Sequence, residues 1–118
     1  CPLLSKDEAL SQADIITIHT SGDECLFNED AFSVMKRGVL LLNAARGNIV
    51  SEKALIKALD EGIVAGAWLD TFEIEPYEGP LCNYKNVILT PHIGSYTSEC
   101  RQHMENEAVS NLLKALQK

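Results

Sequence analysis

The stretch that decides the fold is Val39-Leu40-Leu41-Leu42-Asn43-Ala44-Ala45-Arg46-Gly47. Its apolar first half, Val39–Asn43, predicts a short strand, because an apolar run of this length is too short for a typical helix. Residues 44–50 then predict a loop. Arg46 follows the strand closely and Gly47 allows the backbone to turn sharply, so we expect the guanidinium at the carboxyl end of the strand.

Upstream of this stretch, the sequence predicts a helix and a second strand. Ser5 and Glu8 have the spacing of a capping box, which predicts a short helix over about Lys6–Gln12. The run Asp14–Thr20 is apolar, rich in β-branched residues and too continuous for a half-exposed strand. It therefore predicts a buried parallel strand.

Two further helices are predicted on either side of the central strand. Asn28 is a suitable N-cap for a helix over Glu29–Arg37, which has acidic residues in its first turn, basic residues in its last turn and Gly38 at its end. After the loop, Ser51 predicts the N-cap of a helix that extends to about Glu61.

The C-terminal half continues the alternation of strands and helices. Strands are predicted over Val64–Leu69 and Val87–Thr90, and a last helix from about Thr97 to Leu116. Apolar residues of this helix at i,i+4 spacing predict one buried stripe. They are Met104, Ala108, Leu112 and Leu116, with Val109 and Leu113 beside them.

This alternation predicts right-handed βαβ units and a doubly wound α/β fold, in which a parallel sheet carries helices on both faces. In such sheets ligands bind outside the carboxyl ends of the strands. The polar residues to consider are therefore those at the predicted strand ends. They are His19-Thr20-Ser21, Asn43-Ala44-Ala45-Arg46-Gly47, Asp70 and Thr90-Pro91-His92-Ile93-Gly94.

Length and composition restrict the class of protein. The 118 residues with 46% hydrophobic content fit one globular domain. A net charge of -7 disfavours binding to nucleic acid or to anionic membranes, and no apolar run approaches the roughly 20 residues of a membrane span. We expect a soluble, cytoplasmic protein with free thiols and no metal site, because Cys1, Cys25, Cys82 and Cys100 are scattered without a C-x-x-C pair. The first residue, Cys1, also suggests a fragment or a processed chain.

Three residue types at the strand ends could carry chemistry. Arg46 suits a carboxylate or 2-oxo acid, although an ion pair with a local acid is an equal alternative. His92, between Pro91 and Ile93-Gly94, is the best general acid/base candidate, although a core-edge histidine bonded to backbone is the more common case. One of the acids Asp70, Glu73 and Glu75 could orient that histidine, and otherwise they are loop charges. His19 could contact a ligand or pack, and we expect His103 to be solvated. Gly66 suggests a close backbone approach.

Five strings together resemble the D-isomer-specific 2-hydroxyacid dehydrogenase family, which includes phosphoglycerate, glycerate and D-lactate dehydrogenases. They cover nearly the whole chain in family order. The strings are Ala13-Asp14-Ile15-Ile16-Thr17-Ile18-His19, Met35-Lys36-Arg37-Gly38, Asn43-Ala44-Ala45-Arg46-Gly47, Ala65-Gly66-Ala67-Trp68-Leu69-Asp70-Thr71-Phe72-Glu73-Ile74-Glu75-Pro76, and Asn86-Val87-Ile88-Leu89-Thr90-Pro91-His92-Ile93-Gly94. The resemblance implies the C-terminal half of a Rossmann-like NAD(P)-binding domain.

The resemblance also implies roles for individual residues. Arg46 would bind the substrate, His92 would act as the catalytic acid/base and Glu75 would hold its ring. Asp70 would contact the nicotinamide carboxamide. The residues that would surround the cofactor are His19, Thr20, Ser21, Ala44, Ala45, Arg46, Asp70, His92 and Gly94. The implied reaction is hydride transfer between NAD(H) and a D-2-hydroxy acid or 2-oxo acid.

Two departures from the family pattern matter. No G-x-G-x-x-G occurs, so the family's phosphate loop, ribose-binding acid and substrate domain are expected before this stretch, and the cofactor is NAD or NADP. Ser95 stands where many members have a second glycine. We expect a dimeric parent enzyme and an inactive 118-residue chain. The alternatives are a cofactor-sensing corepressor of the same fold and a purely structural fragment.

Overall fold

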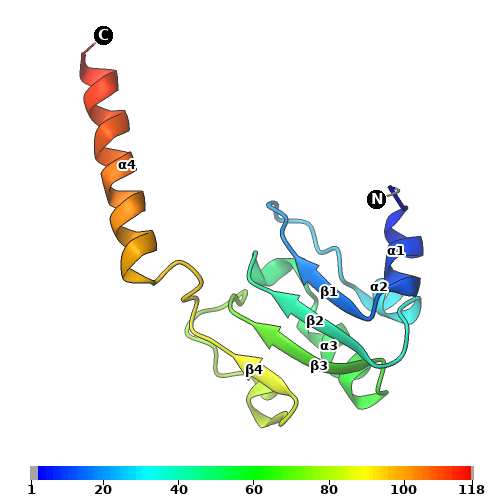
Figure 1. The fold of residues 1–118 in the computed structure, drawn as a ribbon. Coiled ribbons are helices and arrows are strands. Elements are labelled where there is room, and N and C mark those ends of the chain that lie inside the picture. The colour runs from blue at the N-terminus through cyan, green and yellow to red at the C-terminus, as the bar shows by residue number, and fades with distance from the viewer. Residues whose placement is uncertain (1–2, 118) are drawn as a thin grey trace.

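Four parallel strands lie side by side in the order in which they occur along the chain (Figure 1). The computed structural model describes residues 3–117. The strands are β1 (Ile15–Ile18), β2 (Val39–Asn43), β3 (Val64–Leu69) and β4 (Val87–Leu89). The parallel α/β architecture, the C-terminal half of a Rossmann-like fold, is therefore confirmed.

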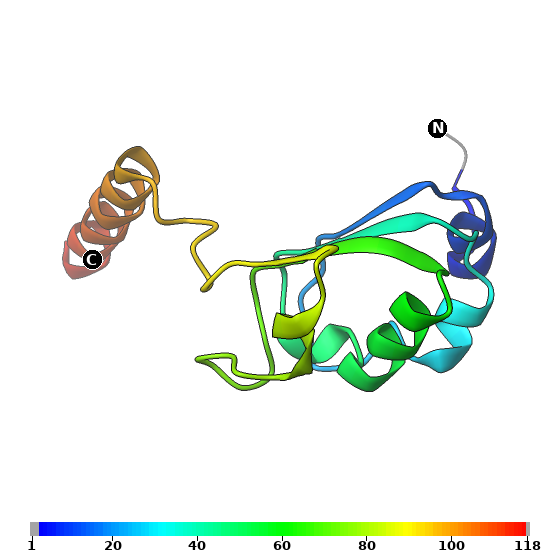
Figure 2. The same cartoon turned by 90° about the horizontal axis from the view of Figure 1, so that it is seen from below.

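The connecting helices all lie on one face of the sheet (Figure 2). The strand order never reverses, and right-handed crossovers between strands that advance in one direction place every connection on the same side. These connections are α2 (Glu29–Ser33), α3 (Glu52–Asp60) and the 3₁₀ turns η1 (Gly47–Ile49) and η2 (Pro80–Asn83). In residues 3–117 the structure thus differs from the expectation of helices on both faces.

The hydrophobic core lies between the sheet and these helices. Its least exposed side chains come from β2, β3, α3 and the two 3₁₀ turns. They are Val39, Leu41, Val64, Leu55, Ile49 and Leu81, each exposed by no more than 2%. The opposite face of the sheet is open, and it exposes Ile15, Leu40 and Ile88.

Helices α1, α2 and α3 each begin directly after the residue whose side chain is predicted to cap the helix. Helix α1 (Lys6–Gln12) begins with the predicted capping box, in which Ser5 and Glu8 bond reciprocally. The side chains of Asn28 and Ser51 cap α2 and α3, respectively. Helix α2 ends at Ser33 rather than Arg37, because a 3₁₀-type bond from the Met35 amide to the Phe32 carbonyl tightens the turn there.

Two predictions of burial are wrong. Strand β1 is not a buried strand: it pairs only with β2, and Ile15 is 63% exposed. Helix α4 (Ser98–Leu116) extends away from the sheet (Figure 1) and contains no buried residue. Its predicted stripe, including Met104 and Leu112, faces solvent because no described element packs against it.

Three smaller expectations concern the cysteines, Gly66 and membrane-spanning helices in the described part of the chain. Cys25, Cys82 and Cys100 are free, and Cys1 lies outside the described residues. Gly66 is the predicted close approach, since a Cβ there would lie 3.0 Å from the Asn86 carbonyl oxygen. No helix in residues 3–117 is long and apolar enough to cross a membrane.

Candidate active site

The candidate residues gather at the carboxyl edge of the sheet, because parallel strands all end on that side. The loop after β2 carries Arg46, the loop after β3 carries Asp70 and Glu75, and the turn after β4 carries His92. Strands β2, β3 and β4 are direct neighbours, so these three connections lie next to one another.

His92 is held by a carboxylate. Its Nδ1 lies 3.1 Å from Oε2 of Glu75, and 52% of its side chain is exposed. The residue has a φ of 55°, which is unusual for a residue other than glycine and turns the chain away from β4. The alternative of a core-edge histidine bonded to backbone is therefore wrong, and Glu75 is the acid that orients the ring.

Each carboxylate oxygen of Glu75 has a hydrogen-bond partner. Its Oε1 accepts a hydrogen bond from the Phe72 amide at 3.0 Å, and Oε2 faces His92. The Phe72 amide, followed by the His92 ring, lowers the pKa of the Glu75 carboxyl below its ordinary value. Near neutral pH this carboxylate is therefore charged, and it can accept a hydrogen bond from Nδ1 of His92.

Asp70 is the buried acid of the site, with 1% of its surface exposed. Its Oδ1 accepts from the Thr90 hydroxyl at 2.5 Å and the Ile93 amide at 2.9 Å, and its Oδ2 accepts from the Gly94 amide at 2.8 Å. Burial raises the pKa of Asp70, but these hydrogen bonds outweigh it, so the pKa lies below the ordinary value. Asp70 therefore holds both residues that follow His92.

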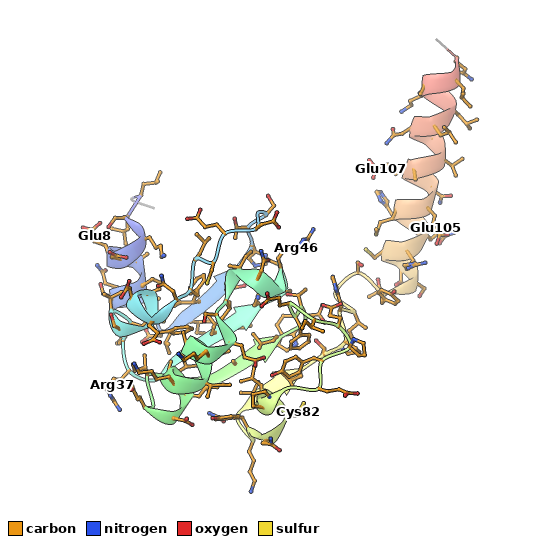
Figure 3. All side chains as sticks on the ribbon, turned by 180° about the vertical axis from the view of Figure 1, so that it is seen from behind. Glu8, Arg37, Arg46, Cys82, Glu105 and Glu107 are labelled. Atoms are coloured by element: carbon orange, nitrogen blue, oxygen red, sulfur yellow. The ribbon has the colours of Figure 1, made fainter. Side chains whose placement is uncertain are left out.

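Arg46 is presented by a loop that a buried amide holds. Oδ1 of Asn43 accepts from the Ala45 amide at 3.0 Å, and Nδ2 donates to the Arg46 carbonyl at 2.9 Å. The Arg46 side chain projects beyond the ribbon (Figure 3) and donates to the Ala45 carbonyl at 2.7 Å. Within residues 3–117 it forms no ion pair, so the alternative of a local acidic partner is not observed. The residue is exposed.

Gly47 lets the arginine loop touch the loop after β3. A Cβ at this position would lie 2.0 Å from the Phe72 carbonyl carbon, which is far inside van der Waals contact. Only glycine fits this approach. The loop that carries Arg46 therefore rests directly on the segment that leads from Asp70 to Glu75.

The other predicted residues lie around this edge with different exposure. His19, Thr20 and Ser21 follow β1 and are exposed, and the His19 ring bonds to the Thr17 hydroxyl at 2.9 Å. Ala44 is exposed, whereas Ala45 is buried in the core. A cofactor would therefore meet the backbone of Ala45 rather than its methyl group.

One acid, Glu73, and one histidine, His103, have no part in this cluster. Glu73 is exposed and forms no hydrogen bond within the described chain. His103 on α4 is solvated as expected, with 81% of its side chain exposed and Glu107 at 3.9 Å. No group of three or more candidate metal ligands occurs in residues 3–117.

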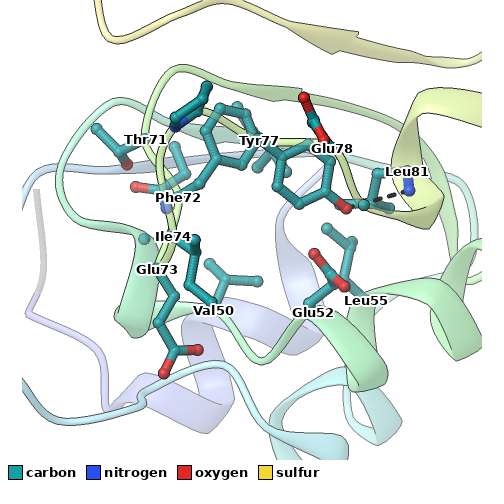
Figure 4. A pocket seen from close by; sticks show the side chains of 15 residues that line it. Val50, Glu52, Leu55, Thr71, Phe72, Glu73, Ile74, Tyr77, Glu78 and Leu81 are labelled. Atoms are coloured by element: carbon teal, nitrogen blue, oxygen red, sulfur yellow. Dashed lines mark hydrogen bonds between the residues drawn. The ribbon is translucent and has the colours of Figure 1, made fainter.

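Two cavities flank the loop after β3. The larger, about 430 Å³, lies between that loop and α3 (Figure 4), and none of Arg46, Glu75 or His92 lines it. There burial raises the pKa of Tyr77 to about 12, and its hydroxyl accepts from the Leu81 amide at 3.2 Å. The smaller cavity, about 360 Å³, is lined by Glu75, Thr90 and Pro91, and so adjoins the histidine turn.

Sequence reasoning missed the residues that hold the loops. The sequence pattern places Asn43 and Thr90 at polar strand ends but does not indicate that they hold a loop, and it gives Trp68 no role of its own. Trp68 Nε1 donates to the Thr90 hydroxyl at 3.0 Å, although 22 residues separate the two. The signal available in the sequence was a polar residue at the end of each apolar strand, but the partners come from different strands.

A parallel sheet with an arginine and an acid-paired histidine at its carboxyl edge is the arrangement that the resemblance to the 2-hydroxyacid dehydrogenases implies. Residues 1–94 match the family described as "D-isomer specific 2-hydroxyacid dehydrogenase, NAD binding domain". The match covers more than half of the chain. The chain therefore belongs to this family.

Named relatives agree with this assignment. The chain is 45% identical over 115 residues to a glyoxylate reductase of Thermofilum pendens, covering 93% of the chain and 34% of that protein. It is 43% identical over 120 residues to chloroplastic D-3-phosphoglycerate dehydrogenase 2 of Arabidopsis thaliana, covering 95% of the chain and 19% of that protein. The chain thus spans about a third of the length of the glyoxylate reductase and about a fifth of the length of the phosphoglycerate dehydrogenase.

A solved structure shows the same fold. The crystal structure of a glyoxylate reductase from Paecilomyes thermophila matches with a TM-score of 0.93 and 38% identity. That match covers 98% of this chain and 36% of the other. The NAD-complexed D-isomer-specific 2-hydroxyacid dehydrogenase of Lactobacillus delbrueckii ssp. bulgaricus matches with a TM-score of 0.86 and 30% identity, covering 97% and 40%.

Proposed function

We propose that this chain supplies the substrate-anchoring and acid/base residues of an NAD-dependent D-2-hydroxyacid dehydrogenase, which interconverts a small 2-hydroxy acid and its 2-oxo acid. The observation that carries the proposal is the His92–Glu75 pair, 3.1 Å apart, at the same sheet edge as an arginine without an acidic partner in the described chain. Family membership and the relatives named above support it.

The residues at the sheet edge fit the nicotinamide end of NAD. A carboxylate offers about four acceptor positions, and Asp70 uses three of them, so one remains for an N–H donor such as the nicotinamide carboxamide. His19, Thr20, Ser21, Ala44, the Ala45 backbone and Gly94 would complete the wall. When bound, NADH supplies the hydride for reduction of the 2-oxo acid.

Arg46 and His92 would act on the substrate. A guanidinium binds a carboxylate through two parallel hydrogen bonds, so Arg46 would fix the 2-oxo acid and counter the negative charge that develops on its carbonyl oxygen. Nδ1 of His92 faces Glu75, which leaves Nε2 for the substrate. In reduction, protonated Nε2 would give its proton to that oxygen, and in oxidation neutral Nε2 would accept the hydroxyl proton.

The activity would belong to a longer protein, since the chain covers only 34% of the glyoxylate reductase named above. In it, other segments would supply the phosphate loop and substrate domain, and we expect the 118-residue chain alone to be inactive. We also propose that this longer protein is a cytoplasmic homodimer that uses NAD or NADP. The free thiols at Cys25, Cys82 and Cys100 support a reducing compartment.

A screen of NADH oxidation tests the proposal. The intact dehydrogenase that carries these residues is assayed with glyoxylate, pyruvate, hydroxypyruvate, its phosphate ester and an aromatic 2-oxo acid. We expect at least one to be reduced to the corresponding 2-hydroxy acid, with the D configuration wherever C2 of the product is a stereocentre. Arg46→Gln should raise the KM for that acid at least tenfold. The matched control is Arg37→Gln, because Arg37 bonds to the Glu61 carbonyl far from the site. Failure of the whole panel with NADH and NADPH would reject the proposal.

A further inference from the structure

A chain of side-chain hydrogen bonds leads from the open face of the sheet to the histidine turn. The Trp68 indole N–H donates to the Thr90 hydroxyl at 3.0 Å, and that hydroxyl donates to Oδ1 of Asp70 at 2.5 Å. Asp70 in turn accepts from the amides of Ile93 and Gly94, the two residues after His92. Four donors are thus arranged around two acceptor groups.

The register of strands β3 and β4 brings the side chains of this hydrogen-bond series together. Trp68 of β3 pairs with Ile88 of β4. Asp70 and Thr90 follow two residues later, each one residue beyond the end of its strand. Side chains two residues apart in a strand lie on the same face. The indole, the hydroxyl and the carboxylate therefore lie on the open face, the side without α2 and α3.

The chemistry of the three groups fixes the direction of the bonds. The indole N–H can only donate, and an ionised carboxylate can only accept. The Thr90 hydroxyl has one proton, so it accepts from Trp68 and directs its proton to Asp70. Without the indole, the hydroxyl could rotate toward another acceptor or toward water.

We propose, resting on the function proposed above, that Trp68 and Thr90 are positioning residues, which hold the Asp70 carboxylate and through it the turn that presents His92. Neither residue needs to touch the substrate for this role. Ile88 pairs with Trp68 in the register, is 63% exposed and has no polar group, so it offers a packing control beside Trp68. The effect of Trp68 depends on its N–H group.

Four variants of the intact dehydrogenase separate this role from simple packing. Thr90→Val removes the hydroxyl while it keeps the shape, and Thr90→Ser restores it. Trp68→Phe keeps an aromatic ring without the N–H, and Ile88→Val is the packing control. The readouts are kcat, the KM for NADH, and the NMR resonance of the indole N–H. That resonance is identified by its absence from Trp68→Phe, Trp68 being the single tryptophan of this chain.

We expect Thr90→Val to lower kcat about tenfold and Trp68→Phe to lower it about threefold, the effects of one or part of one hydrogen bond. The KM for NADH should change less than kcat. Thr90→Ser should restore most of kcat, and Ile88→Val should match the wild type. The indole resonance should move in Thr90→Val and stay in place in Thr90→Ser.

An indole resonance that Thr90→Val leaves in place would overturn the inference, as would a wild-type kcat in that variant. A loss of kcat in Ile88→Val equal to that in Trp68→Phe would also overturn it, since packing alone would then explain the effect. A wild-type enzyme without oxidation of NADH or NADPH would instead reject the proposed function, while the indole resonance still reports on the hydrogen bonds.

Discussion

The loop that carries Arg46 and the turn that carries His92 are built alike but held by different chemistry. Each follows a strand of the same sheet, and each is held by a side chain at the end of β2 or β3 that is only 1% exposed. Asn43, a neutral amide, holds the arginine loop, whereas Asp70, a carboxylate, holds the histidine turn. The arginine loop is therefore held by a neutral group, whereas the histidine turn depends on an ionised group.

The two regions meet at Gly47, and a substitution there should have the largest effect. Gly47→Ala would force a Cβ against the Phe72 backbone, which cannot move without disturbing the segment that leads to Glu75. We expect a loss of about 3 kcal/mol in the free energy of unfolding, at the upper end for overpacking. Urea denaturation of the wild type and the variant measures it. A loss below about 1 kcal/mol would show that the loops are not rigidly in contact.

Asp70→Asn tests the carboxylate itself. An amide has one oxygen, so one of the three donors around Asp70 would face an NH₂ group instead of an acceptor. We expect a loss of about 2 kcal/mol in the free energy of unfolding, as for a buried donor left without a partner, together with a lower kcat. If the variant and the wild type were equally stable, the claim that Asp70 holds the histidine turn would be wrong.

Asn43→Ala makes the matching change in the arginine loop. It leaves the Ala45 amide and the Arg46 carbonyl without their side-chain partner. We expect about 1 to 2 kcal/mol of destabilisation by urea denaturation. Steady-state kinetics should show a higher KM for the 2-oxo acid, because Arg46 is displaced. If kcat fell at an unchanged KM, the division between anchor and acid/base turn would be wrong.

The pH dependence of the free energy of unfolding should distinguish Asp70 from Asn43, and the expected change is smaller than those above. The folded pKa of Asp70 lies below 3.8, so its stabilisation is complete above that pH and is lost as pH falls through the folded pKa. The stability difference between wild type and Asp70→Asn should therefore shrink on acidification below about pH 4, by at most about 1.4 kcal/mol per pH unit.

Asn43→Ala is the control for this titration, since an amide does not change charge. Its offset from the wild type should stay constant from pH 7 to acid conditions in the same urea series. A constant offset for Asp70→Asn as well would contradict the assigned difference between the two loops.

Sequence reasoning was accurate where neighbours in the chain determine the structure. Strands Val39–Asn43 and Val64–Leu69 and helix Lys6–Gln12 have the predicted bounds, because apolar runs and caps are local signals. It was wrong for the burial of β1 and α4, since burial depends on what lies opposite. An amphipathic stripe shows which face of a helix is apolar and not whether another element covers it.

The site shows the same limit. Strand ends identified Arg46, Asp70 and His92 as candidates, because loops converge at the carboxyl edge of a parallel sheet. The choice of Glu75 over Glu73 as the partner of His92 came from the family resemblance. Its contact joins residues 17 apart, and the Trp68–Thr90 bond joins residues 22 apart on two strands. Such contacts depend on strand register, which the sequence pattern did not specify.

The most direct test of the account is a comparison of turnover and cofactor affinity in His92→Gln within the intact dehydrogenase. Glutamine keeps a polar side chain at the turn but cannot transfer a proton near neutral pH. The account predicts that kcat falls by orders of magnitude while the Kd for NADH, measured by calorimetric titration, stays nearly unchanged. An unaltered kcat would contradict the role of His92 and with it the proposed function.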